Sequence, residues 1–441
     1  MNPVSKRETF ATSRLLDFFS EKELVAQIGH SKADWPLVAI KELVDNALDA
    51  CEETGVPPEI AITVTEDGLS VQDNGPGIPA EVIARILDYS VRISSREAYC
   101  EPARGAQGNA LKTLVAMPFV LSGNEEGRLT VQAGGVAHQI TVRVDRIRQT
   151  PLIRHQPTPA PKVQTGTLVQ IHWPRSACSL LGDFARMYKL ALTFVCLNPH
   201  LTLTFRHFTE PDCDWPAIDP AWNKWTAQEP HIAHWYTPER FERLVAAYLA
   251  QDEEAGTHRL VSDFIAGFRG FARSSARKPI LEALALDRKP LTQFATPDGV
   301  DREQTDRLLK HLQHQSRTTD PMKLGLIGKE RIGQRLAQSG YHMSTFKYHR
   351  LIGHDRHGLP RLFETAFAYH PDSQRRLLLT GINWSASLIN PFRQLGSVYT
   401  GLDSHLQELR AGEREPIALL VHLAGPGIQY TDRGKSAVVV E

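Results

Sequence analysis

The chain has 441 residues, of which 41% are hydrophobic and 23% are charged, and its formal net charge is zero. This length exceeds one compact core, so we expect two or three domains. No apolar run is long enough to cross a bilayer, and the neutral balance does not by itself indicate a nucleic-acid partner.

The N-terminus and the cysteines bear on the location of the protein. The opening residues, MNPVSKRETF, lack the hydrophobic core of a signal peptide. The five cysteines include no C-x-x-C pair, and their odd number argues against a disulfide framework. We therefore predict a cytoplasmic protein whose cysteines are small buried apolar residues and do not hold zinc.

The first part of the chain is predicted to combine one long helix with several strands. Periodicity and turn residues indicate a helix over 36–53, strands over 59–65 and 69–72, and strands within 129–148. The Pro-rich stretch 150–161 is predicted to be a loop, and 167–173 a further strand. This order lacks the βαβ rhythm of a parallel sheet, so we expect an α/β sandwich with mixed or antiparallel strands.

The rest of the chain changes character twice. Helices are predicted over 238–250, 301–313 and 329–338, and a strand over 417–423. The predicted fold class is therefore α+β, divided into an N-terminal part over 1–225, a helical insert over 226–337 and a C-terminal α/β part over 338–441.

The charge is unevenly distributed. Between His258 and Pro360 the chain has 18 Lys or Arg against 10 Asp or Glu. The run FRGFARSSARK places basic residues at four-residue spacing, which on one helix would form a basic stripe anchored by interleaved phenylalanines: Arg269, Arg273, Arg277 and Lys278, with Phe264, Phe268 and Phe271. Such a stripe would suit a DNA phosphate backbone, or its arginines would pair with local carboxylates, and both interpretations stay open.

Helical geometry groups the polar residues of the segment KELVDNALDA, residues 41–50. Glu42, Asp45, Asn46 and Asp49 fall on one narrow arc, opposite an apolar stripe. A solvent-facing arc is one interpretation. However, Asn is unfavourable inside a helix, and an amide oxygen beside a carboxylate suits a magnesium ion and a base that takes a proton from water.

Two glycine-rich segments indicate a ligand with a planar ring and phosphates. In VQDNGPGIP, Asp73 ends a strand before Gly75 and Gly77, and a carboxylate there can accept a hydrogen bond from an amine such as that of adenine, although D-N-G is also a common turn. In RGAQGNALKT, residues 104–113, backbone N–H groups before a helix can surround phosphate oxygens. A fourth segment, TGTLVQIHW over 165–173, says little alone.

Together, the order E-x-x-x-N on a helix, D-x-G-x-G, a glycine-rich lid and Gly-Thr resembles the GHKL ATPases, a class that includes gyrase B, MutL, Hsp90 and histidine kinases. The segments KELVDNALDACEE, SVRISSRE, RGAQGNALK, TTDPMKLGLIGKERI and VHLAGPGIQYTDRGKSAV resemble topoisomerase VI B subunits in particular. A histidine kinase is disfavoured, because the nucleotide motifs follow no phosphoacceptor helix. The resemblance implies a Bergerat-type ATPase domain, a helix-two-turns-helix-like insert and a transducer-like domain.

The resemblance also implies roles for individual residues. Glu42 would polarise the attacking water, Asn46 would hold Mg²⁺, Asp73 would read adenine, and Lys435 would be the switch lysine that contacts the terminal phosphate of ATP. The other nucleotide-binding positions implied are Asp49, Gly75, Gly77, Ser95, Arg96, Gly105, Ala106, Gln107, Gly108, Asn109, Ala110, Leu111, Lys112 and Thr167.

Three departures from the family pattern qualify these expectations. Ala110 stands where the family usually has Gly, which makes turnover less certain than binding, and Arg96 stands where Lys is usual. The chain ends six residues after Lys435, whereas the topoisomerase subunit continues into a long helix and tail. We expect either a shortened chain or a different coupling to its partner.

The function implied is that of an ATP-hydrolysing subunit that dimerises on ATP and drives DNA strand passage. Its partners would be a second copy, a topoisomerase VI A-like DNA-cleaving subunit in a heterotetramer, and double-stranded DNA. One alternative is an ATP-gated clamp of a nuclease-containing defence or repair complex without topoisomerase activity. Another is an adaptor that binds ATP without hydrolysing it.

Overall fold

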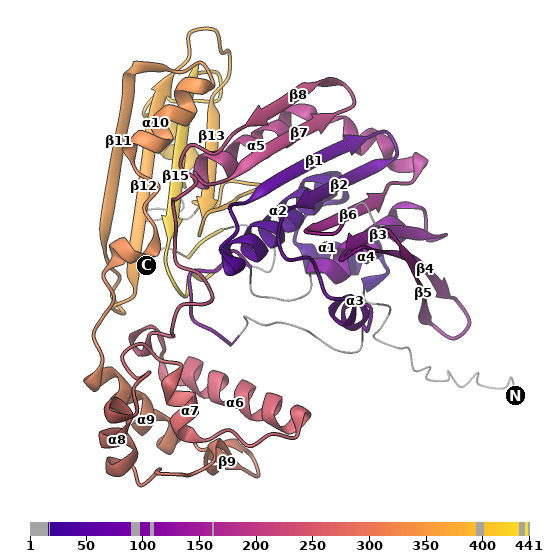
Figure 1. Cartoon of the computed structure of the whole chain (residues 1–441). Coiled ribbons are helices and arrows are strands. Elements are labelled where there is room, and N and C mark those ends of the chain that lie inside the picture. Colours follow the sequence, from indigo (N-terminus) through magenta and orange to yellow (C-terminus); the bar gives the residue numbers. More distant parts are fainter. Residues whose placement is uncertain are drawn as a thin grey trace, which may run out of the picture.

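The computed structural model describes residues 16, 18–89, 98–105, 110–160, 163–393, 401–431 and 437–439. Two large β-sheets lie beside each other, and a lobe built mainly of helices lies below them in Figure 1. The predicted α+β class is confirmed. Among the described residues, no helix has the length and apolar character needed to cross a membrane.

The first sheet has eight strands in the order β5-β4-β3-β6-β2-β1-β7-β8. Only β1 and β7 run parallel, and the other neighbouring pairs are antiparallel, as the sequence predicted. The strands are β1 (Glu59–Thr65), β2 (Gly68–Asp73), β3 (Gly127–Ala133), β4 (Val136–Asp145), β5 (Thr150–Pro159), β6 (Thr167–His172), β7 (Thr202–His207) and β8 (Glu210–Trp215).

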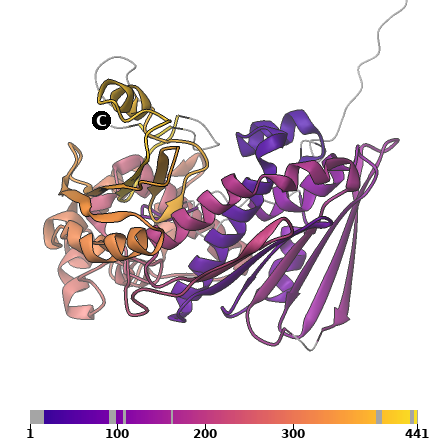
Figure 2. The ribbon, with the colours of Figure 1, turned by 90° about the horizontal axis from the view of Figure 1, so that it is seen from above.

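Helices pack on one face of this sheet (Figure 2). In β1, Ile60, Ile62 and Val64 alternate with more exposed residues and are at most 3% exposed, so one face of the strand belongs to the core. α2 packs on β2, α4 on β3 and α5 on β7. The helices of this part are α1 (Glu21–Ile28), α2 (Trp35–Thr54), α3 (Ala80–Ile86), α4 (Ala110–Leu121) and α5 (Phe184–Leu197), with short 3-10 helices at Lys32–Asp34 and Arg175–Gly182.

The predicted loop over 150–161 was wrong, because Thr150–Pro159 forms the edge strand β5. It pairs with β4 along its whole length, including Pro151, Pro157 and Pro159. Proline lacks the N–H that a central strand needs on both sides, but an edge strand has only one paired side. The Pro content therefore marked the edge of a sheet rather than a loop.

The lobe built mainly of helices contains α6 (Pro238–Ala255), α7 (Val261–Ala266), α8 (Ser274–Ala283) and α9 (Arg302–Gln315), with the two-residue strands β9 (Ala295–Thr296) and β10 (Gly299–Val300). Short 3-10 helices lie at Ala233–Trp235 and Leu291–Phe294. Phe241 and Leu308, with Phe264, Phe268 and Phe271 as the sequence predicted, are buried in its core. The helix-two-turns-helix identity of this lobe stays a prediction.

The predicted basic stripe does not form on one helix. Arg269 lies between α7 and α8, where its Nη2 is 2.9 Å from Glu229 Oε2 and its guanidinium lies over the Trp225 ring. Arg273 is the residue before α8, and Arg277 within α8 donates to the carbonyls of Phe271 and Ala272. Two of the three arginines therefore hold the lobe together, which is the local-pairing interpretation.

The second sheet has the order β11-β12-β15-β13-β14. Its strands are β11 (His342–His354), β12 (Pro360–Tyr369), β13 (Leu377–Ile382), β14 (Ser385–Ala386) and β15 (Ile417–Ala424), and the accompanying helices are α10 (Lys329–Gln338), α11 (Leu402–Glu408) and the 3-10 helix Pro321–Leu324. α10 packs on β11, β12 and α5, so a boundary near 320 describes the contacts better than the predicted boundary at 337. The three-part division itself stays a proposal.

Helix α5 is shared by the two sheets, since it packs on β7 of the first and on β13 and β14 of the second. The approach is close at Gly381, where an added Cβ would stand 2.1 Å from Leu197 Cδ1. A side chain at Gly381 would therefore clash with the buried Leu197 side chain and crowd the Ser385 carbonyl, which a Cβ would approach to 2.9 Å.

Candidate functional site

Helix α2 carries the first motif and is fixed at both ends. Pro36 stands in its first turn, and Gly55, with a φ of 69°, ends it by donating to the carbonyls of Cys51 and Glu52. The apolar stripe predicted from the sequence is buried, including Ile40, Leu43 and Val44. The polar arc is thereby held on the opposite side of the helix.

The four residues of this arc do not share one environment. Asn46 is exposed and the Glu42 side chain is 30% exposed, whereas the Asp49 side chain is 14% exposed. The Asp45 side chain is 6% exposed and binds both Lys41 Nζ at 2.8 Å and Ser385 Oγ of the second sheet at 2.7 Å. Asp45 therefore connects helix α2, which packs on the first sheet, to the second sheet. Helical periodicity alone did not reveal this connection.

Burial governs the ionisation of the Lys41–Asp45 pair. Burial raises the pKa of Asp45 above its usual value, although Lys41 opposes this. Burial alone would lower the pKa of Lys41, but the carboxylates of Asp45 and Glu42 raise it. Lys41 is thus held charged 3.5 Å from Glu42 Oε1.

Asp73, at the end of β2, is oriented by two backbone groups. Its Oδ1 accepts hydrogen bonds from the N–H of Gly75 at 2.8 Å and of Thr167 at 3.1 Å. Burial nevertheless raises the pKa of this carboxyl. Within the described part of the chain, no group donates a hydrogen bond to the other carboxylate oxygen, Oδ2. The protein therefore positions Oδ1, and Oδ2 stays available to a ligand.

The Gly-Thr pair before β6 explains this orientation. Gly166 has a φ of 78°, and a Cβ there would stand 1.9 Å from the carbonyl oxygen of Asp73. Only glycine lets the Thr167 N–H approach Asp73 this closely. The sequence segment that was uninformative alone therefore builds the Asp73 site.

The Asp73 turn also touches helix α2. Asn74 Oδ1 accepts from Cys51 Sγ at 3.4 Å and from the Glu59 N–H at 2.9 Å. A Cβ on Gly75 would meet Cys51 Sγ at 3.3 Å. The structure thus brings the first, second and fourth sequence motifs together, around Cys51, Asp73 and Thr167.

Arg104 opens the third motif and is buried against helix α2. Its Nη1 lies 2.7 Å from Asp49 Oδ1 and 2.6 Å from Glu52 Oε2, and its Nη2 lies 2.6 Å from both Glu52 Oε1 and Asn198 Oδ1. Asp49, predicted to bind nucleotide, is thus paired with Arg104. Gly105 follows, and no described atom would lie within 4 Å of a Cβ built on it.

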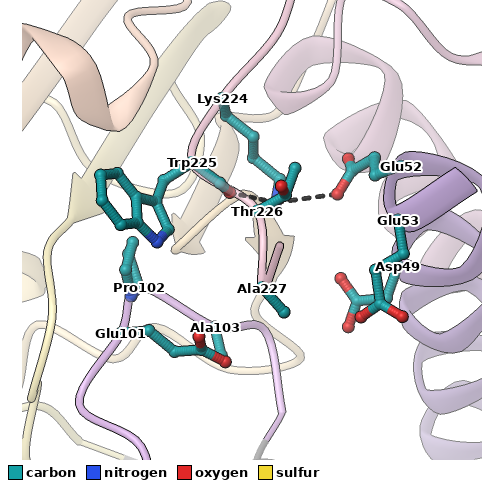
Figure 3. Close-up of a pocket in the computed structure, with 10 residues that line it drawn as sticks. All are labelled: Asp49, Glu52, Glu53, Glu101, Pro102, Ala103, Lys224, Trp225, Thr226 and Ala227. Atoms are coloured by element: carbon teal, nitrogen blue, oxygen red, sulfur yellow. Dashed lines mark hydrogen bonds and ion pairs between the residues drawn. The ribbon is translucent and has the colours of Figure 1, made fainter. Parts of the chain in front are cut away.

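Glu52 is the centre of a charged cluster that the sequence did not predict. Besides Arg104, its carboxylate contacts Lys224 Nζ at 2.8 Å and His200 Nε2 at 3.0 Å, and its side chain is 7% exposed. Figure 3 shows Lys224 reaching Glu52 across a small cavity lined also by Asp49, Glu53 and Glu101. A Glu in the last turn of an amphipathic helix gives no signal of such partners, because they come from distant segments.

Charge and burial compete within the cluster. Burial alone would raise the pKa of Glu52, but Arg104 and Lys224 hold it well below its usual range. Burial and the neighbouring Arg104 lower the pKa of Lys224, although Glu52 opposes this. Burial also lowers the pKa of His200, against the pull of Glu52. We therefore describe Glu52 and Arg104 as charged and His200 as neutral near pH 7.

The remaining predicted residues are only partly described. Lys112 is buried, its Nζ donates to the Asp88 carbonyl at 2.5 Å, and burial lowers its pKa. It would have to leave Asp88 to reach a phosphate. Leu111 is half-buried against the core, and Ala110 begins α4. Outside the described residues lie Ser95, Arg96, Ala106, Gln107, Gly108, Asn109 and Lys435.

The described residues fit an adenine nucleotide with a magnesium ion. Asp73 offers an oriented acceptor oxygen, Gly75, Gly77 and Gly166 keep side chains away from it, and α2 presents Glu42 and Asn46. Within the described residues, no cluster of three or more His, Cys, Asp or Glu side chains forms a ready-made metal cage. One amide ligand and phosphate oxygens suit Mg²⁺, which keeps most of its ligands from water and substrate.

The part of the chain that carries the four motifs matches a known protein family. The family described as "Histidine kinase-, DNA gyrase B-, and HSP90-like ATPase" matches residues 32–176, which hold all four motifs. The chain contains a GHKL ATPase domain. This confirms the class indicated by the sequence, and the matched residues include the strands β1 to β6 and the helices α2, α3 and α4.

Curated relatives extend the similarity beyond the GHKL domain. The B subunit of the type 2 DNA topoisomerase 6 of Methanococcoides burtonii is 24% identical over 96% of this chain and 67% of its own length. The corresponding B subunits from Archaeoglobus fulgidus and Pyrococcus abyssi are 26% and 29% identical over 44% and 46% of this chain. In those two alignments the chain covers only 32% and 36% of the relative, so it spans about a third of their length.

Solved structures show weaker likeness. The ATPase region of Saccharomyces cerevisiae topoisomerase II matches 92% of this chain at 10% identity with a TM-score of 0.39. That score is below the level that establishes a common fold.

Proposed function

We propose that the chain is a magnesium-dependent ATPase that acts as the nucleotide-binding subunit of a topoisomerase VI-like complex. The observation that carries the proposal is Asp73, whose Oδ1 is fixed by the Gly75 and Thr167 N–H groups while its Oδ2 remains available for an adenine amine. The hydrogen bond between Cys51 and Asn74 joins this acceptor to the helix that carries Glu42 and Asn46.

Each residue has a defined task in this proposal. Asp73 accepts a hydrogen bond from the exocyclic amine and so orients the base. Glu42, with a 30% exposed side chain, accepts a proton from the attacking water. Asn46 would hold Mg²⁺, which when bound offsets charge on the phosphates. Lys435 and the positions at 95–96 and 106–109 keep the roles implied by the family resemblance.

The partners follow from the relatives. A chain similar to topoisomerase 6 B subunits is expected to form a homodimer on ATP and a heterotetramer with a DNA-cleaving A-type subunit, and to act on double-stranded DNA in the cytoplasm. Of the four basic residues in the predicted stripe, two are exposed, Arg273 and Lys278. We propose that these two residues of the helical lobe contact DNA.

Two measurements test this proposal. Phosphate release from ATP with and without Mg²⁺ tests the enzyme, and light scattering with a non-hydrolysable ATP analogue tests dimerisation. We expect magnesium-dependent turnover and conversion of monomer to dimer. Binding with a persistent absence of turnover would favour the adaptor. Turnover and dimerisation without supercoil relaxation in the presence of an A-type subunit would favour the nuclease-associated clamp.

A further inference from the structure

The turn between β13 and β14 has an unusual backbone. Asn383 and Trp384 are consecutive non-glycine residues with φ of 50° and 61°. Asn tolerates this left-handed region, but a bulky side chain such as Trp rarely adopts it. Trp384 is fully buried, so surrounding contacts hold the turn in place.

Three consecutive residues of this turn each meet a polar group of the N-terminal part of the chain, two of them within the residues 32–176 that match the GHKL family. Asn383 Nδ2 donates to the Ala103 carbonyl at 3.3 Å, and the Trp384 carbonyl accepts from Asn198 Nδ2 at 2.9 Å. Ser385 Oγ donates to Asp45 Oδ2 at 2.7 Å.

These partners adjoin two elements of the proposed active site. Ala103 directly precedes Arg104, and Asn198 Oδ1 accepts from Arg104 itself. Asp45 binds Lys41, whose Nζ is 3.5 Å from Glu42. The turn therefore contacts both the start of the glycine-rich segment and the helix that carries the proposed base.

The same turn is anchored firmly in the second sheet. The Trp384 N–H donates to His422 Nε2 at 3.2 Å, which leaves His422 Nδ1 to carry the proton toward Glu364 Oε2 at 3.4 Å. Glu364 in turn accepts from the N–H groups of Ile327 and Gly328. Trp384 Nε1 donates to the Gly325 carbonyl.

We propose that Asn383, Trp384 and Ser385 are positioning residues, through which the second sheet aligns helix α2 with the start of the glycine-rich segment for ATP hydrolysis. The inference rests on the proposed ATPase function. It concerns a connection between the second sheet and the N-terminal part of the chain that does not involve the proposed switch lysine, Lys435. None of the three residues is assigned contact with nucleotide.

The geometry explains why this connection should act on turnover. Hydrogen bonds in a buried site cannot be replaced by water, so a shift of either sheet breaks them together. Loss of the Ser385 bond leaves Lys41 as the hydrogen-bond partner of Asp45 among the described residues, and it removes the anchor to the second sheet that positions Lys41 beside Glu42. Misplacement of a reacting group lowers the rate even when binding is intact.

Substitutions at Asn383 and Ser385 can remove the hydrogen bonds to Ala103 and Asp45 while the turn keeps its bonds within the second sheet. Asn383→Asp keeps an acceptor for the Gly425 N–H, which Asn383 Oδ1 holds at 2.8 Å, but loses the donor to Ala103. Ser385→Ala removes only the hydroxyl that reaches Asp45, and Ser385→Thr restores a hydroxyl. Ser387→Ala is the matched control, because Ser387 lies just beyond the same hairpin and no partner of its hydroxyl is described.

We would measure kcat, KM and analogue binding for these variants of the full chain. The expected result is a fall in kcat of about five-fold or more for Asn383→Asp and Ser385→Ala. Affinity for the analogue should stay within two-fold, Ser385→Thr should recover much of the rate, and Ser387→Ala should match the wild type. Unchanged kcat in both variants, or an equal effect in Ser387→Ala, would overturn the inference while leaving the ATPase intact. A wild type without turnover would instead refute the proposed function.

Discussion

The middle and the C-terminal turn of helix α2 show how the same residue type serves different purposes. Near its middle, Glu42 has a 30% exposed side chain and Asn46 is exposed. Ten residues after Glu42, the Glu52 side chain is 7% exposed and contacts Arg104, Lys224 and His200. A buried carboxylate requires such partners, whereas an accessible one remains able to exchange protons with water.

The difference in exposure indicates that Glu42 serves the proposed reaction, whereas Glu52 stabilises the fold. Changing Glu42 should alter the reaction and leave the fold intact. Changing Glu52 should alter stability first, because its partners would lose their common counter-ion.

Glu42→Ala should abolish most ATP turnover. The substitution removes the proposed base but no described residue that orients adenine, so kcat should fall by about 10²–10⁴-fold while ATP binding persists. Steady-state phosphate release and calorimetric titration with an analogue measure the two effects.

The control for Glu42→Ala is Glu53→Ala, which removes a carboxylate from the same helix at a half-buried position outside the proposed reaction. It should retain the wild-type rate. Turnover of Glu42→Ala at the wild-type rate would refute the assignment of Glu42.

Glu52→Gln should destabilise the chain most strongly. Gln cannot neutralise Arg104 and Lys224, and removing one partner of a buried ion pair typically costs about 3–5 kcal/mol. Urea denaturation of this variant and of the neighbouring Glu53→Gln measures the difference. Equal stability of the two variants would show that the cluster contributes little.

Asp73→Asn should weaken ATP binding without unfolding the protein. The amide can still accept from Gly75 and Thr167 through its oxygen, but it presents a donor toward the adenine amine. An unmatched buried polar pair costs about 1–3 kcal/mol, so the dissociation constant should rise by about 5- to 150-fold. Asp67→Asn, on the exposed β1–β2 turn, is the control. Calorimetry that finds the same ATP affinity in both variants contradicts the adenine role.

Local sequence patterns predicted the strands β1, β2 and β6 and the strand-rich segment that holds β3 and β4, but they did not predict β5, β7 or β8. The strand Glu59–Thr65 and the helix Lys329–Gln338 were predicted with their observed bounds, because alternation and helical periodicity are local signals. The clustering of Asp73 with Thr167 was implied only when four motifs were read together. The assigned roles of the individual residues stay predictions.

Long-range contacts explain what the sequence could not give. The Glu52 cluster joins positions 52, 104, 198, 200 and 224, and no local pattern connects them. The supposed basic stripe was wrong because four-residue spacing was taken for a helix, whereas the chain turns between α7 and α8. Similarly, a Pro-rich edge strand depends on having one unpaired side, which only the tertiary structure defines.

The smallest expected effect concerns pH and His200. The Nε2–H group of this residue reaches Glu52, and no partner of its buried Nδ1 is found among the described residues. Protonation would add a further buried positive charge beside Arg104 and Lys224, and burial already lowers the folded pKa of His200 below the usual 6.5. As pH falls through about 6.5 the unfolded chain therefore binds the proton first, and stability declines until the folded pKa is reached. One such proton changes stability by at most about 1.4 kcal/mol per pH unit, and its total contribution between pH 7.5 and 5.5 is at most about 1.4 kcal/mol. His200→Gln can still donate to Glu52 and should lose less stability over this range than His349→Gln, a change on the exposed strand β11. Urea denaturation at the two pH values gives the comparison, and equal losses in both variants would show that His200 does not titrate with folding.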